Sequence, residues 1–207
     1  MPSAERSSSS STPRLPAAER RAQIIDAATR CFADRGFGGT TTASVAQEAA
    51  VNEALLFRHF GSKQGLYLAC VDAAWARLTA RVEALCGNEP VERQWRMPGR
   101  AFIELVQKQP HVAQLWVRGL VETTGIEQVD DHLATLMDDV HRYVTDMVRV
   151  SDDAGGVLDG RDPSTEAWTI IAIGLLGASL GTRGLVKKGA FDKVLAAHRE
   201  WMTGDPD

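Results

Sequence analysis

The side chains best suited to chemistry lie between Thr41 and Lys63 of this 207-residue chain. Arg58 and Lys63 carry positive charge that suits a phosphate or a guanine, while Ala54 or Leu55 could touch a thymine methyl group. Elsewhere the sequence contains no nucleophile–base pair, no phosphate-binding loop, and no thiolate or histidine cluster with metal-ligand spacing. The residue types therefore favour recognition of a nucleic acid over catalysis.

Two short helices joined by a tight turn must position these side chains. Apolar residues recur at helical spacing before the turn (Val45, Ala46, Ala49, Ala50) and after it (Leu55, Leu56, Phe57, Phe60). Asn52 suits the N-cap of the second helix, because its side chain can accept a bond from a free backbone N–H. This is the helix-turn-helix pattern, which presents its second helix to a DNA major groove. Neither helix is long enough to be stable alone, so neighbours must brace them.

Bracing helices are predicted on both sides. Residues 17–35 form a helix whose apolar face holds Ile24, Ile25, Ala28, Cys31 and Phe32. Gly36 follows where a helix can exit through a left-handed residue. Thr41 or Thr42 would cap the next helix, and Ser62 would cap a long helix that runs to about Cys86.

The rest of the chain also predicts helices. They span 98–108, a segment from Pro110, a segment opened by a Thr124-x-x-Glu127 capping box, Pro163 to about Lys187 after a loop at 151–162, and 190–202. The last of these would bury Phe191, Val194, Leu195, and His198 or Trp201. No alternating strand pattern occurs, so we expect an all-α fold of about nine helices.

Composition and charge narrow the class of protein. Hydrophobic residues make up 44% of the chain, yet no run of 18 apolar residues suggests a membrane span. Three widely spaced cysteines indicate a reducing cytoplasm and no disulfide framework. The net charge is −4, but eight basic and six acidic residues give residues 1–63 a charge of +2. The Ser/Pro-rich residues 1–16 predict a disordered tail, which is either only solvated or a basic arm whose Arg6 or Arg14 reaches a minor groove.

Residues 20–66 resemble the DNA-binding domain of the tetracycline-repressor (TetR) family of transcriptional regulators. The resemblance is carried by Ile25, Ala28 and Phe32, by Arg35-Gly36-Phe37, by the threonine pair, by Val45-Ala46-x-x-Ala49 and Val51, and above all by Leu56-Phe57-x-His59-Phe60-x-Ser62-Lys63. It implies a disordered tail at 1–16, a DNA-binding domain at 17–64, and a ligand-binding and dimerisation domain at 65–207. The region beyond residue 66 agrees with the family in length and helix count but has no diagnostic motif.

The family resemblance also implies a homodimer that binds double-stranded DNA at a palindromic operator. The DNA-binding residues it implies are Thr41, Thr42, Asn52, Glu53, Ala54, Leu55, Phe57, Arg58, His59 and Lys63. Three positions depart from the family pattern. Ala43 lacks a common basic phosphate contact, Glu53 stands where lysine is frequent, and Ala50 replaces the usual turn glycine. If Ala50 is left-handed, we expect that Ala50→Gly does not destabilise the fold.

In the family, the second domain binds a small-molecule effector. Candidate pocket residues here are Trp95, Phe102, Trp116, Met137, His141 and Trp168, although large apolar residues on such helices are often plain core. Small residues three or four apart (Gly174, Gly177, Ala178, Gly181) predict a dimer interface, to which the last helix adds Val194 and Trp201. The alternative is that this apolar helix is the core helix of a single subunit. Asp138 and His141 could ligate a metal, but a solvated acidic face explains them better.

The favoured hypothesis is a cytoplasmic repressor whose DNA binding is relieved by a small, largely apolar effector, with no cofactor, no metal and no membrane partner. An enzyme or carrier that uses the helical pocket is a second hypothesis. A third is an interaction protein whose helix-turn-helix docks on another protein. Activation instead of repression stays open, as do the effector and the operator.

Overall fold

The computed structural model describes residues 16–122, 124–181 and 189–205, and these ranges are helical with no strand. The helices are α1 (Ala17–Gly39), α2 (Thr42–Glu48), α3 (Glu53–Phe60), α4 (Lys63–Cys86), α5 (Met97–Lys108), α6 (Pro110–Val121), α7 (Glu127–Asp153), α8 (Pro163–Gly181) and α9 (Ala190–Thr203), with a 3₁₀ helix η1 (Val91–Arg96) before α5. The predicted all-α class is confirmed. None of the helices in these ranges is long and apolar enough to cross a membrane.

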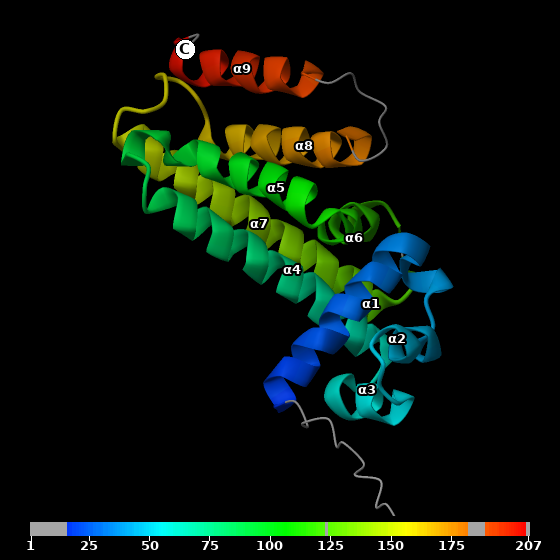
Figure 1. Cartoon of the computed structure of the whole chain (residues 1–207). Helices are drawn as coiled ribbons and strands as arrows, with labels where there is room; N and C mark the ends of the chain where they lie inside the picture. Colours follow the sequence, from blue (N-terminus) through cyan, green and yellow to red (C-terminus); the bar gives the residue numbers. More distant parts are fainter. Residues whose placement is uncertain (1–15, 123, 182–188, 206–207) are drawn as a thin grey trace, which may run out of the picture.

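The helices are arranged in a small module and a larger body (Figure 1). Helices α1–α3 form one end of the molecule, and α9 with the C-terminus lies at the opposite end. Between them, α4 packs on α5 and α7, α8 packs on α5 and α7, and α9 lies against α8. The two ends are therefore connected through the long helices α4 and α7.

The module and the body share one hydrophobic core. Ile24 and Phe32 of α1 are fully buried, as is Leu66 of α4. The Phe32 ring meets the Tyr67 ring edge-on, with 5.0 Å between the ring centroids. Helix α1 also packs along α6, so the helix-turn-helix module contacts the larger body through α6 as well as through α4.

The kink at Gly36 confirms the predicted exit of the first helix. Gly36 has φ +69°, and one more helical turn follows before the helix ends at Gly39. A Cβ added to Gly36 would lie 2.5 Å from a carboxylate oxygen of Glu122, the residue directly after α6. That flexible side chain could move, so it is the positive φ that favours glycine here.

Several predicted details are wrong. Helix α7 has Ile126 at its N-cap with no side-chain bond, so the Thr124–Glu127 capping box does not form. The Thr124 hydroxyl instead donates to the Asp130 carboxylate at 2.8 Å. Helix α7 continues into the predicted loop as far as Asp153, and η1 was not predicted.

The last helix also buries different side chains from those predicted. Val194 and Trp201 are about half exposed on this chain, whereas Met202 is fully buried. The predicted stop of the preceding helix near Lys187 lies outside the described residues, as do Arg6 and Arg14 of the tail.

Candidate functional site

Local capping bonds form the two helices of the helix-turn-helix. The Thr41 hydroxyl accepts the backbone N–H of Ser44 at 3.1 Å, and the Ser44 hydroxyl in turn lies 3.3 Å from the Thr41 N–H, a reciprocal capping box. The Asn52 side chain accepts the N–H of Leu55 at 2.8 Å, as predicted. Ser62 caps α4 in the same way, at 3.0 Å from the N–H of Gly65.

The turn between α2 and α3 has a left-handed residue. Ala50 has φ +53°, which confirms the conformation considered from the sequence, and it is the one non-glycine residue with positive φ in the described ranges. Its N–H donates to the carbonyl of Gln47, and the N–H of Val51 donates to the carbonyl of Ala46. This pair of bonds is a Schellman motif, in which glycine is the usual left-handed residue.

Helix α3 buries one side and exposes the other. Leu56 is 2% exposed and packs into the core, whereas Phe57 is 47% exposed. Among the predicted DNA-binding residues, Thr41, Asn52, Ala54, Phe57 and Arg58 are exposed, and Thr42, Glu53, Leu55, His59 and Lys63 are half-buried. The exposed side of α3 thus carries an aromatic ring, a small apolar residue and a cation, with the caps at its N-terminal end.

Glu53 has a structural contact that the sequence did not predict. Its carboxylate accepts a hydrogen bond from the Thr42 hydroxyl, which joins the first turns of α2 and α3. The negative charge also lies in the first turn of α3, where it complements the helix dipole. Both observations support a positioning role for Glu53 and Thr42 within the module.

Two cations lie on aromatic rings around α3. The Lys63 ammonium is 4.4 Å from the centroid of the Phe37 ring, and partial burial lowers the Lys63 pKa. The guanidinium of Arg21, on α1, lies 5.0 Å from the centroid of the Phe60 ring at the end of α3. Arg21 was not predicted as a site residue, because its proximity to Phe60 depends on how α1 crosses α3 and not on sequence spacing.

The larger body contains an apolar cavity of about 50 Å³ between α4, α5, α6, α7 and α8, called here the cavity. The predicted pocket residues Phe102, Trp116 and Met137 line it, together with Trp75 and Tyr143, which were not predicted. The Trp75 ring packs edge-on against the Trp116 ring and the Tyr143 ring, with centroid distances of 6.1 Å and 5.5 Å. In the described structure the buried Trp116 Nε1 has no hydrogen-bond partner.

A wider hollow of about 420 Å³ lies between η1 and α5 on one side and α8 and α9 on the other, called here the groove. Trp95, another predicted pocket residue, lines it. The remaining two predicted residues, His141 and Trp168, line neither hollow. They stack on one another at 4.3 Å between ring centroids, and Trp168 is 46% exposed.

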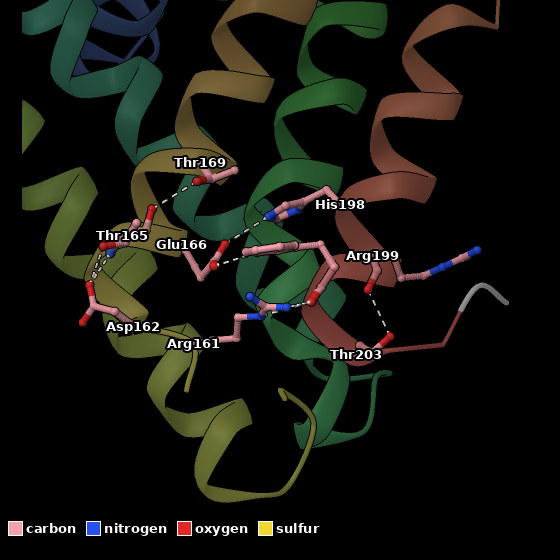
Figure 2. A network of polar contacts seen from close by, with 9 residues as sticks. Arg161, Asp162, Thr165, Glu166, Thr169, His198, Arg199 and Thr203 are labelled. Atoms are coloured by element: carbon pink, nitrogen blue, oxygen red, sulfur yellow. Dashed lines mark hydrogen bonds and ion pairs between the residues drawn. The ribbon is translucent and has the colours of Figure 1, made fainter. Parts of the chain in front are cut away.

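A buried carboxylate connects α9 to α8 beside the groove (Figure 2). Glu166 is 5% exposed and accepts the indole N–H of Trp201 at 2.9 Å, while His198 Nε2 lies 3.4 Å from its other oxygen. Arg161 donates to the backbone carbonyl of Trp201 and covers the Trp201 ring at 3.5 Å. Burial lowers the pKa of His198 although Glu166 acts to raise it. These contacts fix the position of α9 over the groove.

The glycines of the predicted dimer interface make close contacts within this chain. A Cβ at Gly174 would lie 3.2 Å from the Phe102 ring, and one at Gly177 would lie 2.5 Å from the Phe191 ring. Both glycines therefore let α5 and α9 approach α8. Val194 and Trp201 are exposed. Ala178 and Gly181 lie beyond the described side chains. Within the described ranges no group of His, Cys, Asp and Glu could hold a metal ion, including Asp138 and His141.

This geometry defines a class of protein. It is an all-α chain with a helix-turn-helix at its N-terminal end and cavities in a larger helical body. Residues 24–70 match the family described as bacterial regulatory proteins, tetR family. Over these residues, which run from α1 into α4, the chain has the DNA-binding domain of the TetR family.

Curated relatives match the chain over part of its length. The HTH-type transcriptional repressor Rv3405c of Mycobacterium tuberculosis is 34% identical over 47% of this chain and 57% of its own. The HTH-type transcriptional activator FasR of Mycolicibacterium smegmatis is 34% identical over 45% of this chain and 43% of its own. RaaS of M. tuberculosis, a transcriptional regulatory protein, is 33% identical over 70% of this chain and 63% of its own. The chain thus spans little more than half the length of the first of these relatives.

Solved structures share the fold across most of the chain. A Rhodococcus sp. chain assigned to the TetR family aligns with a TM-score of 0.75 and 23% identity over 90% of this chain and 100% of that one. FadR of Bacillus subtilis in complex with stearoyl-CoA aligns with a TM-score of 0.73 and 12% identity, over 87% and 98%. AibR in complex with isovaleryl coenzyme A and operator DNA aligns with a TM-score of 0.67 and 16% identity, over 88% of this chain and 97% of that one. At these identities the alignments establish the fold alone.

Proposed function

We propose that this chain is a sequence-specific DNA-binding transcriptional regulator. The observation that carries the proposal is the exposed side of α3, where Ala54, Phe57 and Arg58 project from a braced helix-turn-helix. A helix presented in this way fits a major groove, where an arginine can bond guanine and small apolar groups can touch a thymine methyl. The N-terminus of α2, with Thr41, supplies free N–H groups for a backbone phosphate.

The functional form is a homodimer that acts as a repressor on a palindromic operator. Exposed apolar side chains on α8 (Trp168 and Leu176) and α9 (Val194 and Trp201) support a self-association surface. One relative is a repressor and another an activator, so a reporter gene behind the operator decides the direction. Reporter output that falls when the protein is expressed supports repression, and output that rises supports activation.

A small, largely apolar effector relieves DNA binding in this proposal. The cavity is walled by aromatic and aliphatic side chains and lies under α6, which packs on α1. Arg118 of α6 donates to the backbone carbonyl of Asp34 at 3.2 Å, next to the kink at Gly36. An effector that prefers a shifted α6 would therefore move α1 and change the spacing of the two DNA-binding modules of the dimer. FadR and AibR were each solved with an acyl-CoA, which supports an effector with an apolar part.

A gel-shift assay with the chain and the DNA upstream of its own gene tests the proposal. We expect sequence-specific binding that weakens steeply between 50 and 200 mM salt, because phosphate contacts release counterions. Replacing both Arg58 and Lys63 by Ala should abolish the shift while the oligomer stays intact. Arg142→Ala with Arg149→Ala on α7 is the matched control, because both arginines are exposed and pair only with neighbours on their own helix. A protein that binds no DNA would instead be a helical small-molecule-binding or interaction protein. A control variant that loses binding equally would mean that net charge, and not Arg58 and Lys63 in particular, explains the loss.

A further inference from the structure

The groove and the cavity are separated by a thin wall. Both hollows are lined by Gly99 of α5 and by Ile170 and Gly174 of α8. Gly99 and Gly174 have no side chains, and a Cβ built at Gly99 would lie 3.9 Å from Ile170 Cγ2. Ile170 is the one shared lining residue that has a side chain, and the Phe102 ring lies against Gly174 on the cavity side.

The two hollows differ in size and polarity. The cavity is apolar and, at about 50 Å³, has room for a few heavy atoms, since a single water needs roughly 10–15 Å³ of such space. The groove is about eightfold larger and has guanidinium groups in its lining, from Arg96, Arg100 and Arg199. A molecule that occupies both must have a short apolar end and a larger polar end.

The charges around the groove favour an anion. Two carboxylates, Glu104 and Asp192, also line it. Glu104 is paired with Arg81 at 2.8 Å and with Lys108 at 3.2 Å from outside the lining, and it lies 3.7 Å from Arg100 within it. Arg96 makes no ion pair with any described residue. Its pKa is lowered by burial and by the neighbouring guanidinium groups of Arg199 and Arg93, which outweigh the opposite effect of Glu89 and Asp205. An anion placed beside Arg96 would relieve this repulsion between like charges.

Two buried N–H groups at the groove lack partners. In the described part of the chain, the N–H groups of Trp95 Nε1 and Arg96 Nε are both buried and donate to no acceptor. Trp95 is 3% exposed, and the Arg96 guanidinium lies 5.2 Å over its ring. A buried donor without an acceptor costs free energy, and a specific unsatisfied donor in a native structure calls for an explanation. Oxygen atoms of a bound ligand supply one.

We propose that the groove and the cavity together bind one anionic amphiphile, with its anionic group at Trp95 and Arg96 and its short apolar end in the cavity beyond Gly99 and Ile170. This inference rests on the proposed function only where it names the ligand as the effector. Binding of the ligand is argued from the groove and does not depend on DNA binding. Phosphate and carboxylate groups share the required chemistry, namely negative charge and oxygen acceptors.

Calorimetric titration of the full chain with small probes tests the two ends of the ligand. We expect n-butyl phosphate to bind at least tenfold more tightly than n-butanol, which lacks the anion, and than inorganic phosphate, which lacks the tail. Pentanoate in place of butyl phosphate distinguishes a carboxylate from a phosphate ligand, and either one binding in this way supports the proposal. Butanol that binds as tightly as both anions would overturn the anion site, and inorganic phosphate that binds as tightly as butyl phosphate would overturn the tail site.

Variants locate the anion. Arg96→Gln should weaken butyl phosphate binding about tenfold, whereas Arg93→Gln should not, because Arg93 is exposed on the same 3₁₀ helix but does not line the groove. Trp95→Phe keeps an aromatic side chain, smaller than the indole, and removes one unpaired N–H, so affinity for butyl phosphate should fall by more than the loss of packing alone explains. A purely structural Trp95 would lower the melting temperature and leave affinity unchanged. Equal losses in the Arg96 and Arg93 variants would contradict the site.

A third variant locates the tail. Gly99→Ala places a methyl group in ordinary contact with Ile170 and narrows the connection. Its affinity for butyl phosphate should fall to that for inorganic phosphate, and unchanged affinity would exclude the tail from the cavity. Gel shifts of the ligand-free wild type and of ligand-free Arg96→Gln separate the two proposals. A wild type that binds butyl phosphate but no DNA defeats the proposed function alone. A wild type that binds DNA but no butyl phosphate defeats this inference alone.

Discussion

Ala50 adopts a left-handed conformation that costs an L-residue with a side chain roughly 1 kcal/mol. We predict that Ala50→Gly leaves the free energy of unfolding unchanged or raises it, because the relieved strain offsets the added flexibility of glycine in the unfolded chain. Urea denaturation measures the change. Ala54→Gly, on the exposed side of α3, is the control and should lose about 1 kcal/mol, because that position is helical. An equal loss at both positions would mean that Ala50 is not strained in solution.

Residues whose contacts are local could be predicted from the sequence. Thr41, Asn52 and Ser62 each cap a helix through a backbone N–H three residues ahead, so the residue type and the start of the periodic pattern suffice. The bond between Thr42 and Glu53 spans eleven residues and depends on the angle between α2 and α3. No sequence spacing encodes that angle, and this bond was therefore found only in the structure, whereas the sequence allowed the prediction that Glu53 stabilises the N-terminus of α3.

Glu53 also places a negative charge on the side of the module proposed to face DNA. We predict that Glu53→Lys tightens non-specific DNA binding and steepens the dependence of log affinity on log salt by about one, because one phosphate contact is added. Fluorescence anisotropy with random-sequence duplex DNA at several salt concentrations measures the slope. Glu92→Lys, an exposed residue in the first turn of η1, is the control. If both variants steepen the slope equally, net charge and not position explains the effect.

At the scale of elements, the periodic helices were predictable and their less regular boundaries were not. Residues 91–96 form a 3₁₀ helix of six residues, too short and too charged to show an apolar period. Of the alternatives His198 and Trp201, the chain covers His198, and Val194 is exposed, because periodicity identifies an apolar stripe without saying which partner covers it. The exposed α9 stripe and the groove both depend on how α9 packs on α8, and this packing involves the buried Glu166 and His198.

His198 makes the docking of α9 sensitive to pH. Burial lowers its pKa in the folded chain below the ordinary 6.5, so the fold favours the neutral ring. The corresponding stability is present above pH 6.5 and is lost as the pH falls through the lowered folded value. We predict that amide exchange in α9 accelerates between pH 7 and 5.5, after correction for the intrinsic rate, and that His198→Gln flattens this dependence. His111→Gln is the control, since burial also lowers the pKa of His111 but this residue lies on α6. A response to pH that persists in His198→Gln would place the sensitive group elsewhere.

At the scale of the whole molecule, the division at residue 64 inferred from the sequence does not separate two independent cores. The Phe32 and Tyr67 rings pack across it, and Arg118 of α6 reaches the backbone of Asp34. Such long-range contacts could not be read from local patterns. They explain how occupancy of a cavity in the body can be transmitted to α1, as the proposed function requires.

Dimerisation is the remaining requirement, and the exposed apolar residues of α8 and α9 allow a direct test. Leu176 is 55% exposed and Val194 45%, so the described residues leave much of both side chains uncovered. We predict that Leu176→Glu with Val194→Glu converts a dimer to a monomer in analytical ultracentrifugation, since two charges per subunit would have to be desolvated in the interface. The fold should hold, because exposed substitutions usually change stability by less than about 0.5 kcal/mol.

Val150→Glu on α7 is the matched control for the dimer, because Val150 is a 50% exposed apolar residue on a different helix. It should sediment as the wild type does and keep full affinity for a palindromic operator. The double variant should lose operator affinity by more than tenfold, since a monomer contacts one half-site and gains nothing from the second. A double variant that stays dimeric would move the interface away from α8 and α9. A monomer with full operator affinity would mean that one α3 suffices to recognise the DNA.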